Sequence, residues 1–171
     1  MSDIIYNTET LIADDEGTES MPYQDPDGIW TVGIGHNLEA NGLPPGICGD
    51  APDGLNWEDG VLPFLQSRNG LNPAEIDALF KYDLTIAAQD LVACLPNADT
   101  LILPRYAAMI DACFNLGRAK LLKFNTFLHL MEIGQYAAAA QDLLNNTAVA
   151  KQLPERYGRL AQIITSGEWP T

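Results

Sequence analysis

The chain has 171 residues, of which 47% are hydrophobic and 19% charged. This length and composition suit one folded domain or two small lobes, and they exclude a disordered tail or a fibre. Its nine Lys and Arg against 23 Asp and Glu give a net charge of −14, which argues against a nucleic acid or an anionic membrane surface as partner.

The first predicted elements are a short helix and a β-hairpin. Apolar residues at positions 4, 5, 11 and 12 share one face at the helical period, which predicts a helix over 3–14 that ends near Gly17. In the segment 23–36, a Pro-Asp-Gly turn is followed by alternating apolar residues, and this pattern predicts the hairpin. We interpret the acidic turn as turn chemistry and not as a calcium loop, because the later ligands are missing.

A long loop and a long helix come next. Residues 40–71 are rich in Gly, Pro, Asp and Asn, which favours a surface loop with one helical turn near 57–66. Asn72 as N-cap, Pro73 at the first helical position and Glu75 in a capping box then predict the start of a helix over about 73–93.

From residue 105 the pattern is helical almost to the end of the chain. We predict helices near 105–116, 125–133, 135–146 and 155–166, three of them stopped by a glycine. The expected fold class is therefore α+β, with a small N-terminal part, a linking helix and an all-helical C-terminal part. No transmembrane span, secretory signal, C-x-x-C or H-E-x-x-H motif is found, so we expect no signal peptide, metal or cofactor.

The residues that suggest chemistry surround the hairpin. Glu16 comes just after the first helix, Asp25 at the turn and Thr31 on the returning strand. Two carboxyls in different surroundings suit glycoside hydrolysis, in which one donates a proton and the other acts on the water or the cationic centre. Spacing alone leaves open the alternative that these are ordinary surface carboxyls, because pairs of acidic residues are common in so acidic a chain.

This block resembles the T-even phage-type lysozymes, glycoside hydrolase family 24. The resemblance lies in the spacing of three residues: eight residues separate Glu16 from Asp25, and five separate Asp25 from Thr31. Thr31 is followed directly by the run Val-Gly-Ile-Gly-His. It extends to segments 79–83, 114–117, 124–127, 152–156 and 167–169. It implies a lysozyme-like α+β domain over 1–171, with an N-terminal lobe at about 14–71, a linking helix at 73–93, and a helical lobe at 95–171 on which helix 3–14 packs.

The resemblance also implies roles for individual residues. Glu16 would be the general acid, Asp25 the base or nucleophile-like carboxylate, and Thr31 the holder of the attacking water. The substrate would be the β-1,4 bond between N-acetylmuramic acid and N-acetylglucosamine in peptidoglycan, cleaved with inversion. Arg156 stands where the family has an arginine that pairs with the catalytic glutamate. Three further positions would line the cleft: Phe114, together with Asn37 and Asp142, whose types depart from the family's Leu and Asn.

Asp83 and His36 are predicted to form an ion pair. Asp83 lies on the apolar stripe of the long helix, where an unpaired carboxylate would cost several kcal/mol. No Lys or Arg precedes Arg68, and His36 closes the hairpin, so it is the available cationic partner in that half. The family resemblance points to the same pair.

The resemblance suggests a setting. It implies a monomeric endolysin that acts on peptidoglycan glycan strands and waits in the host cytoplasm until a holin releases it to the wall. Two alternatives remain: a tail, baseplate or glycan-binding component with a lysozyme fold, and a lytic transglycosylase. The intact Glu, Asp and Thr set favours the hydrolase. Two features depart from the family, namely the long 40–71 loop and the acidic charge.

Overall fold

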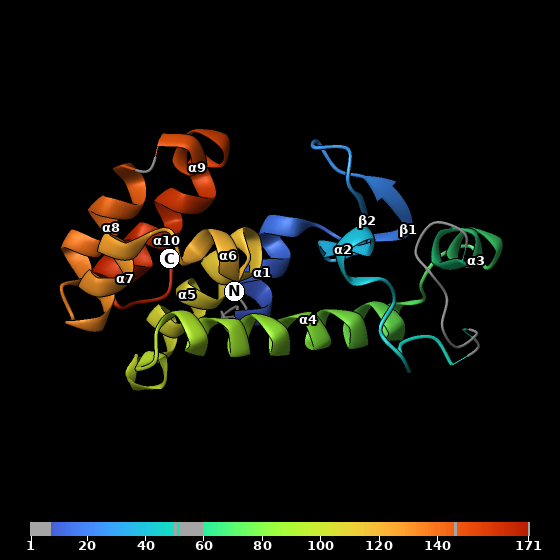
Figure 1. Cartoon of the computed structure of the whole chain (residues 1–171), viewed down its shortest axis with the longest axis horizontal. Coiled ribbons are helices and arrows are strands. Elements are labelled where there is room, and N and C mark those ends of the chain that lie inside the picture. The colour runs from blue at the N-terminus through green and yellow to red at the C-terminus, as the bar shows by residue number, and fades with distance from the viewer. Residues whose placement is uncertain (1–7, 50, 52–59, 146, 171) are drawn as a thin grey trace, which may run out of the picture. The chain divides into compact units, whose positions relative to one another are not determined.

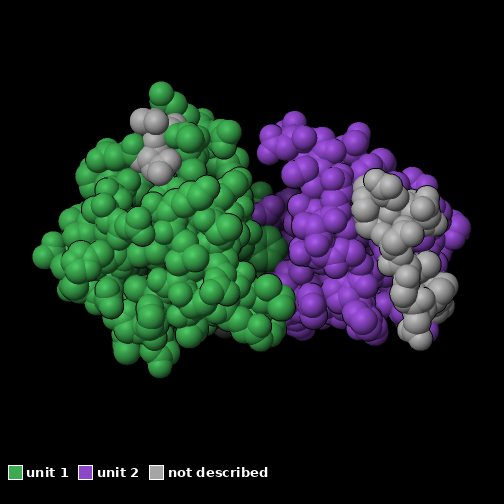
Figure 2. Space-filling view, viewed as in Figure 1, with its two compact units in different colours: residues 1–15, 84–171 green, residues 16–83 purple. Residues whose placement is uncertain are grey.

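The computed structural model describes residues 8–49, 51, 60–145 and 147–170 (Figure 1). The chain divides into two compact units, coloured separately in Figure 2. Unit 2 holds residues 16–83, and unit 1 holds the described residues of 1–15 and 84–171. The predicted helical positions at 3–7 and the Trp57 end of the predicted turn lie outside the described residues.

Unit 2 contains a small antiparallel sheet. Strands β1 (Glu19–Gln24), β2 (Trp30–Gly33) and β3 (His36–Asn37) lie in the order β1-β2-β3. The predicted hairpin is confirmed as β1 and β2, and the two-residue β3 is an addition that the sequence did not indicate. Two short helices, α2 (Leu38–Asn41) and α3 (Leu62–Ser67), complete the unit together with the first half of α4 (Pro73–Cys94).

The prediction of a surface loop over 40–71 is wrong at several described residues, whereas the predicted helical turn overlaps α3. Cys48, Val61 and Leu65 are almost fully buried and pack in one apolar cluster with Val32 of β2 and Leu79 of α4. The Gly- and Pro-rich composition hides this contribution, because irregularly spaced apolar residues give no helical or strand period. The segment therefore stabilises the hairpin by packing on it, and each buried large apolar side chain contributes roughly 1.5–3 kcal/mol to the free energy of folding.

The start of α4 forms the predicted capping box. The Asn72 side-chain oxygen accepts from the backbone N–H groups of Ala74 and Glu75, and a Glu75 carboxylate oxygen accepts from the Asn72 N–H at 2.8 Å. Glu75 also pairs with Arg68 at 2.8 Å. Partial burial alone would raise the pKa of Glu75, but these hydrogen bonds and the Arg68 charge lower it. The capping box thus fixes the first turn of α4, the helix that carries Asp83.

Unit 1 is helical. It contains α1 (Thr8–Glu16, except Glu16 itself), the rest of α4, a 3-10 turn (Ala98–Thr100), α5 (Leu103–Leu116), α6 (Arg118–Leu121), α7 (Asn125–Glu132), α8 (Tyr136–Asn145), α9 (Thr147–Gln152) and α10 (Pro154–Ser166). Helix α10 packs on α5 and α8. The α+β fold class is confirmed. Among the described residues, no helix combines the length and apolarity that a bilayer span requires.

Candidate active site

Asp25 lies in the turn that joins β1 to β2. Its Oδ1 accepts hydrogen bonds from the backbone N–H groups of Asp27 and Ile29, both at 2.9 Å. The turn closes through a bond from the Gly28 N–H to the Asp25 carbonyl oxygen at 2.9 Å. An aspartate that accepts from the backbone two residues on is typical of such turns. The two N–H dipoles complement the negative charge of this carboxylate and fix its direction.

Thr31 lies in the middle of the sheet. Across the strands it faces Tyr23 of β1 and Asn37 of β3, so these three side chains share one face. The neighbouring pair, Val32 and His36, points to the other face. All three side chains, Thr31 included, are buried. The Thr31 hydroxyl donates to the Ile29 carbonyl at 3.1 Å, which leaves its oxygen lone pairs as acceptors. The geometry suits a hydroxyl that holds a water by accepting its hydrogen.

Glu16 is the last residue of α1 and is half-buried. Its carboxyl lies against Gly35, in the turn between β2 and β3. Burial raises the pKa of the Tyr23 phenol, and three nearby carboxylates raise it further, namely Glu16, Asp25 and Glu19. Within unit 2 the structure therefore gathers the predicted catalytic residues around one face of the hairpin, with Tyr23 among them.

His36 and Asp83 form the predicted pair. The Nδ1 atom of His36 lies 2.8 and 2.9 Å from the two carboxylate oxygens of Asp83, and Nε2 lies 2.7 Å from the Gly42 carbonyl oxygen. Both partners are acceptors, so the arrangement is satisfied when both ring nitrogens carry protons. The pair ties β3 to α4 and the end of α2 in one network.

Arg156 is buried at the start of α10 in unit 1. Its Nε and Nη2 atoms each lie 2.7 Å from Oδ1 of Asp111 in α5, and Nε lies 3.6 Å from an Asp15 carboxylate oxygen. Asp15 in turn pairs with Arg159. Burial raises the pKa of Asp111 to about 7, against the opposing influence of Arg156. The predicted pairing of Arg156 with Glu16 stays a prediction.

The three predicted substrate positions are placed on different elements. Asn37 is in unit 2, where its side chain caps α2 by accepting from the Ala40 N–H at 2.8 Å. Phe114 of α5 and Asp142 of α8 are both half-buried in unit 1. Asn37 thus has a structural role, and its amide N–H groups are still able to donate to a ligand on the Thr31 face.

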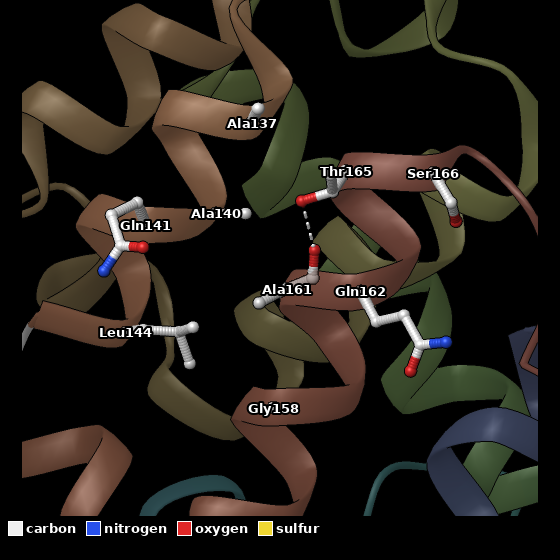
Figure 3. Close-up of a pocket in the computed structure, with 9 residues that line it drawn as sticks. All are labelled: Ala137, Ala140, Gln141, Leu144, Gly158, Ala161, Gln162, Thr165 and Ser166. Atoms are coloured by element: carbon white, nitrogen blue, oxygen red, sulfur yellow. Dashed lines mark hydrogen bonds between the residues drawn. The ribbon is translucent and has the colours of Figure 1, made fainter.

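Two of the pockets that the described residues form lie in unit 1. One of about 450 Å³ lies between α8 and α10, and its lining includes the small residues Ala140, Gly158 and Ala161 (Figure 3). At its edge the Thr165 hydroxyl donates to the Ala161 carbonyl. The other, of about 330 Å³, lies at the start of α10 and is lined in part by Asp15 and Arg156. Among the described residues, no group of three or more His, Cys, Asp or Glu could hold a metal ion.

Sequence reasoning missed three residues around these sites. Asp111 carried a usable signal, because a carboxylate amid the buried face of α5 needs a partner just as Asp83 does. Tyr23 carried none, since its place depends on strand register. Gly35 belongs to the Gly-Ile-Gly-His run of the resemblance, but its close approach to Glu16 has no signal in the sequence.

The sequence of the chain is similar to those of known lysozymes. The sequence model of a family described as phage lysozyme matches residues 13–157. A protein named probable T4-type lysozyme 1, from Dictyostelium discoideum, is 28% identical over 176 residues, which cover 96% of each chain. A second, probable T4-type lysozyme 2 from the same organism, is 27% identical over 173 residues with the same coverage.

Proposed function

Because the chain belongs to the phage lysozyme family, we propose that it cleaves the β-1,4 bond between N-acetylmuramic acid and N-acetylglucosamine. Family membership makes it a glycoside hydrolase of the lysozyme type, a muramidase-like peptidoglycan hydrolase. The observation that supports the choice of residues is the gathering of Glu16, Asp25 and Thr31 around one hairpin, each in different surroundings.

The proposed mechanism uses these surroundings. Protonated Glu16 gives its proton to the glycosidic oxygen as the bond from that oxygen to C1 breaks. A water whose hydrogen is accepted by Thr31 attacks C1 from the opposite face and gives its proton to ionised Asp25. The backbone N–H groups of Asp27 and Ile29 hold Asp25 in place for this step. The product has inverted configuration.

Analysis of the products tests this function against its alternatives. Purified peptidoglycan digested by the protein should yield muropeptides with a free reducing end at N-acetylmuramic acid. An anhydro sugar at that position would identify a lytic transglycosylase instead. Binding to the insoluble wall without release of any fragment would identify a glycan-binding component. Mass spectrometry of the soluble fraction distinguishes the three results.

The proposed setting is lysis of a bacterial host, with the enzyme held in the cytoplasm until a holin opens the membrane. This setting rests on the resemblance to phage lysozymes. The two relatives from Dictyostelium discoideum are consistent with the activity and say nothing of a phage. A monomer is sufficient for the mechanism, because every residue that it uses belongs to one chain.

The acidic charge predicts an unusual response to salt. Residues 1–67 hold 13 Asp and Glu and no Lys or Arg, and the rest of the chain is nearly balanced. Repulsion from an anionic wall is strongest at low ionic strength, so activity on whole cells should rise as NaCl increases towards about 0.1–0.15 M, where the Debye length shrinks to about 10 Å or less. Turbidity assays over a salt series measure this. A steady fall in activity from the lowest salt would contradict the prediction.

A further inference from the structure

The turn between β2 and β3 has a feature that the proposed mechanism does not use. Gly35 has a φ of +73°, a conformation that residues with a side chain rarely adopt. A Cβ atom at this position would lie 2.8 Å from Oε2 of Glu16, 3.1 Å from its Cδ and 3.3 Å from its Cγ. The carboxyl group of Glu16 therefore lies where a side chain at position 35 would begin.

The turn that carries Gly35 is held from both sides. Val32 of β2 pairs with His36 of β3, and His36 is fixed by Asp83 and by the Gly42 carbonyl oxygen. Thr31 lies on the strand that leads into the same turn. Gly35, against which Glu16 lies, thus belongs to the same hydrogen-bonded strand and turn as Thr31, the residue proposed to hold the water.

We propose that Gly35 is a positioning residue that sets the place of the Glu16 carboxyl relative to Thr31. A side chain at position 35 would displace the Glu16 carboxyl from the hairpin face. Glu16 is the last residue of α1, so no following helical turn holds it in place. Misplacement of an acid by about 1 Å can cost about 100-fold in rate. The inference rests on the proposed role of Glu16 as the general acid.

Gly46 offers a matched control. It lies in the same unit with a φ of +84°, and a Cβ atom there would meet nothing within 4 Å. Gly46→Ala therefore introduces the backbone strain without the contact. We expect Gly35→Ala to lower kcat by about 100-fold with little change in KM. Gly46→Ala should keep most of the wild-type rate at a similar loss of thermal stability.

A double-mutant cycle tests the contact apart from the chemistry. In a Glu16→Ala background the clash is gone, so Gly35→Ala should lower the Tm only as much as Gly46→Ala does. This also covers the case in which Gly35→Ala alone fails to fold, because Glu16→Ala should then restore folding. Independence of the two substitutions, or a wild-type kcat in a folded Gly35→Ala, would overturn the inference. Full activity of Glu16→Gln would overturn the proposed role of Glu16 as the general acid instead, and products without a reducing N-acetylmuramic acid end would overturn the proposed function.

Discussion

Replacing Glu16 by Gln is expected to lower the rate of peptidoglycan hydrolysis by at least about 100-fold, the usual scale for loss of a general acid. The amide keeps the size of the side chain and its fit against Gly35, so the fold should stay intact. What is lost is the proton that the leaving oxygen needs. The measurement is the initial rate of turbidity loss of purified peptidoglycan, with circular dichroism to check that the variant is folded.

Glu19 provides the control for this experiment. It is an exposed glutamate at the start of β1 in the same unit, and its charge also acts on Tyr23. Glu19→Gln makes the same chemical change in the same region, and the rate of this variant should stay close to wild type. An equal loss in both variants would mean that the carboxylates act through the general field around the hairpin and that Glu16 is not the acid. Near-normal activity of Glu16→Gln would contradict the assignment of Glu16 as the general acid.

The sequence predicted the elements whose signals are local. The N-terminus of α4 is the clearest case, since Asn72, Pro73 and Glu75 form in the structure the caps that their order in the chain indicates. The hairpin followed in the same way from its turn residues and its alternating apolar residues. Short helices such as α6 and α9 were missed because a four- or six-residue helix has no room for a hydrophobic period.

The parts that the sequence did not predict depend on contacts between distant residues. Burial of Cys48 and Val61 follows from how their segment lies on Val32 and Leu79, and nothing in the segment's own composition reports it. Gly35 is similar, because its proximity to Glu16 joins positions that are far apart along the chain. The spacing of Glu16, Asp25 and Thr31 became informative through the family resemblance, and the structure added the hydrogen bonds that orient Asp25 and Thr31.

Replacing Asp83 by Asn is expected to lower the free energy of unfolding by about 3 kcal/mol, the scale for breaking a buried, charge-assisted pair. His36 is 2% exposed, and both its ring nitrogens lie against acceptors. An asparagine has one acceptor oxygen and no charge, so the protonated imidazole would lose most of its compensation. Because the pair ties β3 to α4 within unit 2, its loss should loosen the sheet. Urea denaturation at constant pH measures the difference.

Asp77 on the same helix is the matched control. It pairs with Lys81 at 2.9 Å, but both side chains are more than half exposed, so Asp77→Asn should cost about 0.5 kcal/mol or less. Equal effects of the two substitutions would show that the His36–Asp83 pair adds nothing beyond a surface charge contact.

The activity of Asp83→Asn shows whether Asp83 affects only the stability of the fold or also the reaction. Since Asp83 lies on the side of the sheet opposite Thr31, the folded Asp83→Asn protein should keep most of its rate well below its lowered Tm. A loss as large as that of Glu16→Gln in a fully folded protein would place Asp83 in the catalytic machinery and contradict its purely structural role.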